Sequence, residues 1–260
     1  MNKANDLNKK VLEWVKGQGY PLEMKVATSF RNRGFEVIQS HYYPDPESND
    51  LREIDIVAIT PEYTGLIDVS FVIECKSSKE KPWVLFTSEH TLEGLNRLFL
   101  YCVHSDSARN ILVEKHIETC LKIPWMKKSG RVAYGLTQAF TTGSDVTFKA
   151  STGVLKAAIS RKRILGKKGY SPFIFVFPVI VVDGKIFECF IDKHGELSIQ
   201  QFHHGFYYFP FDVAGEFGTC IQVLTVNRID EFTEHAKNVS DSLFSLLKKD
   251  VEKKLKTILP

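Results

Sequence analysis

The spacing of apolar residues along the chain changes repeatedly between the period of a helix and that of a strand. Leu22, Val26 and Phe30 share one face of a helix that begins near Pro21, a residue favoured in a first turn. The same reasoning predicts a set of helices over residues 12–15, 21–33, 91–103, 107–121, 155–165 and 230–259. Together with the strands below, these helices predict an α/β fold.

Short apolar runs between these helices have the length and composition of strands. We expect strands over residues 35–43, 53–60, 69–77, 173–182, 185–191 and 220–226. The run at 173–182 leads into Asp183-Gly184, a dipeptide favoured in two-residue turns, which predicts a hairpin that returns over 185–191.

Composition and length are those of an ordinary globular protein. The chain has 260 residues, of which 43% are hydrophobic and 25% charged, so it can bury a full core. Without an internal repeat or a low-complexity linker, we expect one domain over residues 1–260. The scattered cysteines indicate reduced thiols, the first residues lack a signal peptide, and no apolar run could span a bilayer. We therefore expect a cytoplasmic protein with no membrane partner.

Charged residues occur inside or beside two of the predicted strands. Asp55 lies in the run at 53–60, while Glu74 and Lys76 end the run at 69–77. Alternation along a strand turns Glu74 and Lys76 to one face. Burying bare carboxylates costs several kcal/mol unless they are paired or bind a metal. Their oxygens suit Mg²⁺ or Mn²⁺, and the backbone carbonyl of Cys75 could add a ligand.

This arrangement of acids and lysine resembles a known enzyme family. The pattern Asp-(x)n-Glu-x-Lys, formed by Asp55, Glu74 and Lys76, is similar to the motif of the PD-(D/E)XK nuclease superfamily. Glu23, on the predicted helix at 21–33, resembles the helical glutamate that often precedes this motif. The order of helices and strands is also similar, over about residues 20–105.

The resemblance implies a restriction-endonuclease-like core, with a mixed central sheet flanked by helices. The motif core would cover about residues 20–105, a helical insert about 105–170, and later strands with a C-terminal helix 171–260. It also implies a magnesium- or manganese-dependent nuclease that hydrolyses phosphodiester bonds, chiefly in DNA. A bacterial or phage-related defence or restriction effector is the implied setting, as a homo-oligomer or in a larger defence complex. The implied catalytic residues are Glu23, Asp55, Glu74 and Lys76.

The roles of these charged residues are not fixed by their pattern. Lys76 could deprotonate the attacking water if its pKa is lowered, or it could stabilise the transition state as a cation. A Glu-x-Lys pair alone is also common on solvated strand faces, and an acid such as Glu23 is favoured in any first helical turn. The alternative for the chain as a whole is an inactive nucleic-acid-binding or assembly subunit with the same fold.

A basic cluster near the predicted helix at 155–165 is the candidate for contact with nucleic acid. The net charge of the chain is only +3, so local clustering matters more than the total. The cluster could contact the phosphate backbone, or it could be a solvated helix end whose cations complement the helix dipole. It consists of Arg161, Lys162, Arg163, Lys167 and Lys168.

Overall fold

The fold combines helices with one large mixed sheet. The computed structural model describes residues 3–93, 100–115, 130–141, 145–167 and 172–258. The helices within these ranges are α1 (Lys3–Lys16), α2 (Tyr20–Asn32), α3 (Asp106–Glu114), α6 (Val146–Lys167) and α7 (Ile229–Ile258). The strands are β1 (Glu36–Pro44), β2 (Leu51–Ile59), β3 (Ile67–Ser88), β4 (Val103–His104), β5 (Val132–Gln138), β6 (Phe173–Ile191), β7 (Leu197–Phe202), β8 (His204–Val213) and β9 (Glu216–Thr225). The predicted α/β class, with a mixed central sheet flanked by helices, is confirmed.

Two long strands, β3 and β6, form the centre of the sheet. They lie parallel from the pair Ile67–Phe173 to the pair Phe86–Cys189. On the free edge of β3, antiparallel β2 covers the first half and antiparallel β5 the second half, and β1 extends the sheet beyond β2. On the edge of β6, β9 and β7 pair with successive parts of the strand.

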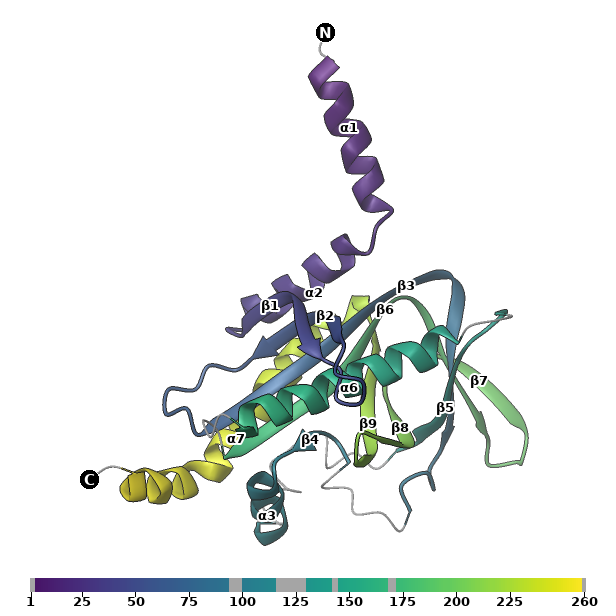
Figure 1. The fold of residues 1–260 in the computed structure, drawn as a ribbon. Coiled ribbons are helices and arrows are strands. Elements are labelled where there is room, and N and C mark those ends of the chain that lie inside the picture. Colours follow the sequence, from purple (N-terminus) through teal and green to yellow (C-terminus); the bar gives the residue numbers. More distant parts are fainter. Residues whose placement is uncertain (1–2, 94–99, 116–129, 142–144, 168–171, 259–260) are drawn as a thin grey trace.

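Five strands of the sheet also pair in a closed circuit, in the order β3, β5, β8, β9, β6 and back to β3. β5 meets β8 at the pair Ala133–Tyr207, β8 pairs with β9, and β9 pairs with β6, which lies beside β3. A sheet that closes in this way must curve strongly, and its concave face needs side chains to fill it. Helix α6 supplies them, and Figure 1 shows it lying along the curved strands.

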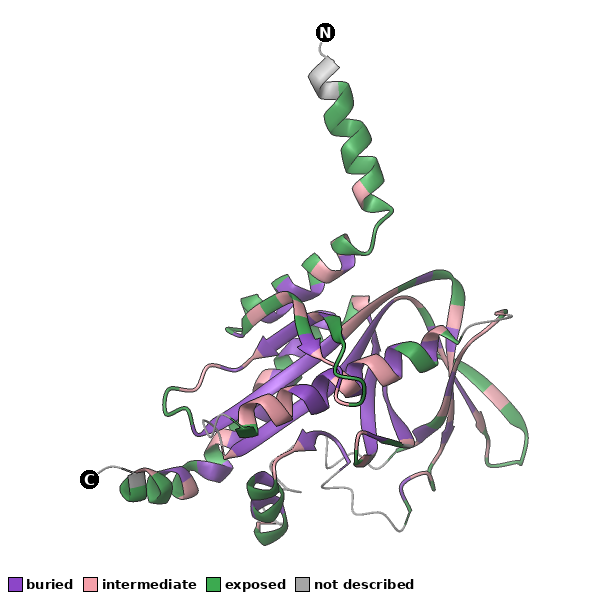
Figure 2. Cartoon of the chain, in the orientation of Figure 1, coloured by how far each residue is buried: buried purple, intermediate pink, exposed green. Residues whose placement is uncertain are grey.

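Each face of the sheet has its own apolar core. On the concave face, Val154 and Ala158 of α6 are buried with Trp83 of β3 and with side chains of the other four strands of the circuit. On the opposite face, α2 and α7 bury residues such as Phe30 against Phe71 of β3, with ring centroids 5.9 Å apart. Figure 2 shows the central strands and the inner sides of these helices as buried. The two layers hold β3 in the middle of the molecule.

Helix α1 differs from the others because it extends away from the body of the protein (Figure 1). Its apolar residues Leu7 and Trp14 are exposed. Within the described ranges, no helix combines the length and the apolar composition needed to cross a membrane.

The predicted hairpin at Asp183-Gly184 is wrong. These residues lie within β6, which continues from Phe173 to Ile191 without turning. Gly184 is needed for a different reason, because a Cβ atom there would come within 2.3 Å of the carbonyl oxygen of Ser78 on β3. The glycine therefore allows the close approach of two backbones rather than a turn.

The strand predicted over 69–77 ends too early, because β3 continues to Ser88 after an irregularity in its pairing with β6 between Ser78 and Trp83. The predicted insert at 105–170 is not wholly helical, since β5 lies within it and pairs with β3. Of the predicted helix at 91–103, residues 94–99 lie outside the described ranges, and Val103 belongs to strand β4.

Candidate active site

Asp55 lies where the alternation of side chains along β2 is interrupted. Ile56 and Ala58 face α2 and α7, whereas Val57 and Ile54 both face α6. Strict alternation would put Ile54 with Ile56, so the pattern breaks at Asp55. Opposite Asp55 in the register, Ser40 of β1 has a φ of 49°, a conformation uncommon outside glycine. This coupled irregularity removes Asp55 from the regular ladder.

The ladder between β2 and β3 ends at the pair Ile56–Ile73, one residue before both acids. Beyond that pair, the Asp55 carboxylate replaces a backbone acceptor, because its Oδ2 accepts a hydrogen bond of 2.6 Å from the Cys75 N–H. The bond fixes the carboxylate beside Cys75, within β3 and just past the last β2–β3 pair. Oδ1 of Asp55 has no hydrogen-bond partner among the described residues, so one oxygen is left to bind a ligand.

Glu74 and Lys76 lie on the same face of β3, as their spacing predicts. Their side chains form an ion pair through Lys76 Nζ and Glu74 Oε1. The side chain of Glu74 is 14% exposed and that of Lys76 is 32% exposed, so the pair lies at the protein surface but is shielded from most water. The Cys75 side chain between them packs against the core formed with α2 and α7.

Glu23 of α2 lies close enough to the strands for its charge to act on them. Burial, and then the charges of Asp55 and Glu53, raise the pKa of Glu23, and Glu23 in turn contributes to the raised pKa of Glu74. The structure therefore brings together the four residues suggested by the sequence: Glu23, Asp55, Glu74 and Lys76.

The electrostatics of this site are dominated by carboxylates with too few partners. Burial raises the pKa of Asp55 and that of Glu74, even though Lys76 acts to lower both. Burial acts to lower the pKa of Lys76, but the neighbouring Glu74 and Asp55 raise it above its ordinary value. One ammonium group thus faces several acids, an excess of negative charge that favours a bound cation.

A metal ion at this site would have two carboxylate ligands from the protein. Among the described residues, no group of three or more His, Cys, Asp or Glu side chains could hold an ion alone. The free oxygens of Asp55 and Glu74 nevertheless fit Mg²⁺ or Mn²⁺, since such ions often take one or two carboxylates and complete their shell with water and phosphate. The donor set fits a metal that is shared with a substrate.

Tyr43 of β1 also belongs to the surroundings of this site, although it was not among the residues selected from the sequence. Burial and then the charge of Glu74 raise the pKa of Tyr43 to about 12. Its hydroxyl donates a hydrogen bond of 3.2 Å to the carbonyl of Gly153 in α6. A tyrosine in an apolar strand has no sequence pattern that distinguishes this position from ordinary packing.

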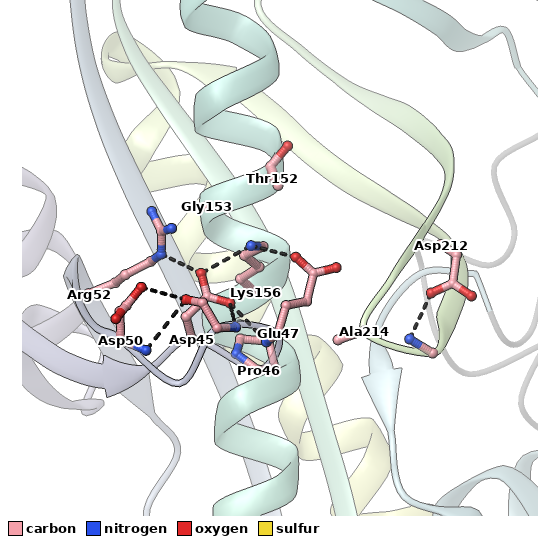
Figure 3. A network of polar contacts seen from close by, with 12 residues as sticks. Asp45, Pro46, Glu47, Asp50, Arg52, Thr152, Gly153, Lys156, Asp212 and Ala214 are labelled. Atoms are coloured by element: carbon pink, nitrogen blue, oxygen red, sulfur yellow. Dashed lines mark hydrogen bonds and ion pairs between the residues drawn. The ribbon is translucent and has the colours of Figure 1, made fainter.

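A second buried carboxylate, Asp45, lies in the loop between β1 and β2 and has many partners. Figure 3 shows it between Arg52 of β2 and Lys156 of α6. It also accepts hydrogen bonds from the N–H groups of Glu47 and Ser48, at 2.9 and 3.4 Å. This network joins the β1–β2 loop to α6, at a place separate from the ion pair on β3.

The basic cluster predicted to bind nucleic acid is largely occupied by contacts within the protein. Arg161 binds Asp68 and Ser70 of β3, at 2.6 and 2.8 Å. Lys162 pairs with Glu216, and Arg163 donates to backbone carbonyls. Lys167 is exposed at the end of α6, and Lys168 lies outside the described residues. At least three of the five cations therefore help to position α6 on the sheet.

Compared with protein-family models, with curated proteins and with solved structures, the chain shows no match to any of them. Its function must therefore be argued from the geometry and chemistry of its own residues.

Proposed function

We propose that this protein is a metal-dependent nuclease with a restriction-endonuclease-like core. The observation that carries the proposal is the meeting of Asp55 and Glu74 at the point where the β2–β3 ladder ends, with Lys76 paired to Glu74. Two acids with raised pKa values beside one lysine support this proposal, because perturbed pKa values gather at functional sites. The substrate proposed is DNA, in a bacterial defence or restriction setting.

Each residue has a role in this proposal that its position supports. Asp55 is oriented by the Cys75 N–H, and with Glu74 it would hold Mg²⁺ or Mn²⁺, to which the Cys75 carbonyl could add a ligand. A bound ion of this kind neutralises phosphoryl charge and activates water. Lys76 is proposed to act on the same phosphoryl group, either as a cation or as a proton acceptor. Glu23 adds negative charge beside Asp55 and is proposed to orient water.

Contact with the phosphate backbone is proposed for the basic cluster at the end of α6. Because Arg161, Lys162 and Arg163 already have internal partners, Lys167 and Lys168 are expected to carry most of it. Fewer phosphate contacts mean a weaker dependence of binding on salt. The other surfaces of the substrate site must then contribute to affinity.

The proposal is tested by removing the charge of each acid without changing its shape. Asp55→Asn and Glu74→Gln should each abolish cleavage of DNA and RNA substrates in the presence of Mg²⁺ or Mn²⁺. Glu36→Gln, which changes an exposed carboxylate at the far end of β1, is the matched control and should cut normally. Cleavage at the wild-type rate by Asp55→Asn, in a folded protein, would rule out this site.

A further inference from the structure

A cavity next to the proposed site lies between the sheet and α6. Its volume is about 260 Å³. Its floor is formed by Ile54, Val57 and Val72 of β2 and β3, and Ala157 and Ile164 of α6 form the opposite wall. We call this space the α6 cavity. Its size is that of a pocket for one small group, below the range usual for drug-sized ligands.

The strands that form the floor of the α6 cavity also carry three of the proposed catalytic residues, Asp55, Glu74 and Lys76. Val72 and Glu74 point to the same face of β3 and are two residues apart, which corresponds to about 7 Å along a strand. Ile54 directly precedes Asp55. Tyr43 lines the cavity and is close enough to Glu74 for that charge to act on its hydroxyl. A group in the cavity would thus lie within the length of one nucleotide from a phosphate beside Asp55.

The polar groups of the cavity are few and are held in place. Arg161 is fixed by Asp68 and Ser70 through two of its nitrogens, and its Nη1 has no hydrogen-bond partner among the described residues. Burial and then the charge of Arg161 lower the pKa of His41, so its ring is neutral near pH 7. A neutral imidazole offers one donor and one acceptor.

These features select a flat, uncharged ligand with polar edges. The ion pair between Arg161 and Asp68 cancels the charge of the arginine, so the cavity does not favour a phosphate. Its apolar floor favours a ring, and the planar groups of His41, Tyr43 and Arg161 are of the kinds on which bases stack. A hydrogen-bonding edge could be satisfied by Arg161 Nη1 and His41.

We propose that the α6 cavity binds one unstacked nucleobase of the substrate, adjacent to the phosphate that would be cleaved beside Asp55, Glu74 and Lys76. The inference rests on the proposed nuclease function and specifies its substrate further. A paired and stacked base cannot reach such a cavity. The protein therefore acts on single-stranded nucleic acid, or on a nucleotide that leaves its duplex.

Binding measurements with and without bases test this proposal directly. The probes are a short labelled single-stranded DNA of mixed sequence and an abasic strand of the same length, in EDTA, which prevents metal-dependent cutting. The variants are His41→Ala, which removes a planar wall, and Ile164→Trp, which fills the cavity from the half-buried side of α6. His194→Ala, in the exposed turn after β6, is the matched control.

Wild-type protein should bind the strand with bases more tightly than the abasic strand. His41→Ala and Ile164→Trp should weaken binding of the base-containing strand by about 5- to 150-fold, the effect of about 1–3 kcal/mol of stacking. Binding of the abasic strand should not change, and His194→Ala should leave both affinities unchanged. Equal affinity of the wild-type protein for both strands, or unchanged binding by both cavity variants, would overturn the proposal.

A cleavage assay on the same proteins separates this inference from the proposed function. If the wild-type protein cuts DNA or RNA but shows no preference for bases, the nuclease stands and the base pocket is wrong. If base-dependent binding is lost in both cavity variants while no metal supports cleavage, the pocket stands and the nuclease activity is wrong.

Discussion

Asp45 and Asp55 belong to the same β1–β2 unit, yet their carboxylates differ in the number of their partners and in the direction of their pKa shifts. The Asp45 side chain has no exposed surface, and it is bound by two cations and two backbone N–H groups. Although burial acts to raise the pKa of Asp45, these partners lower it to about 2. Asp55 receives one backbone hydrogen bond, and burial keeps the pKa of Asp55 above its ordinary value.

The comparison indicates that burial alone does not mark a functional acid. A carboxylate with all its partners inside the protein contributes to stability and has no free oxygen for a ligand. One that is buried with too few partners costs stability, and it becomes favourable when a cation arrives. On this basis we interpret Asp45 and Lys156 as a structural pair, and we propose that Asp55, Glu74 and Lys76 form a site for a ligand.

The largest effect should come from the lysine at each site, because the two lysines have opposite roles. Lys76→Ala should lower the single-turnover cleavage rate by about 10²–10⁴-fold at saturating Mg²⁺, while binding of metal and DNA persists. Lys76→Arg keeps the charge but cannot readily lose a proton, so it should restore more of the rate if Lys76 acts only as a cation.

Lys156→Met is the matched control for the lysine prediction. It should reduce stability because it removes a partner of Asp45, but the cleavage rate of the folded protein should be unchanged. If the Lys76→Ala protein cuts at the normal rate, Lys76 is an ordinary solvated lysine with no part in cleavage. A rate loss in folded Lys156→Met as large as that of Lys76→Ala would remove the distinction between the two sites.

The second effect concerns folding stability in the absence of metal. Asp45→Asn should lower the free energy of unfolding by about 3 kcal/mol, because Lys156 and Arg52 lose a buried partner. Asp55→Asn should leave stability unchanged or raise it by about 1 kcal/mol, because it removes charge from an acidic cluster. Urea unfolding of both variants in EDTA measures the difference, and equal losses would contradict the comparison.

Sequence alone could predict the ingredients of this site but not how they are arranged. The i, i+2 spacing of Glu74 and Lys76 places them on one face, because β3 is regular there. The direction of the Asp55 side chain could not be predicted in this way. It depends on a break in the alternation of β2 that also involves Ser40 on the neighbouring strand. Nothing local to either residue specifies the break, because it involves two paired strands at once.

The errors in the predicted fold have the same physical origin. Asp183-Gly184 has the composition of a turn, but its glycine is required by Ser78, a residue distant in sequence. Strand β5 contains Gly135 and its alternation is irregular, so its place is specified by pairing with β3 rather than by its own pattern. Contacts between distant segments determined these elements, whereas α2 and α7 could be predicted from their own apolar faces.

The smallest effect is a dependence of stability on pH that belongs to Asp45. Its pKa is about 2 in the folded protein, below the ordinary 3.8 that applies when the chain is unfolded. The stabilisation is therefore complete above the unfolded pKa and is lost as the pH falls toward the folded pKa. It amounts to at most about 2 kcal/mol, of which about half should be gone near pH 3.

Urea unfolding of the wild-type protein and Asp45→Asn, from about pH 6 to about pH 3, should show two curves that converge as the pH falls. Curves that stay parallel would mean that the Asp45 carboxylate is no better satisfied in the folded protein than in water, and the contrast with Asp55 would then fail.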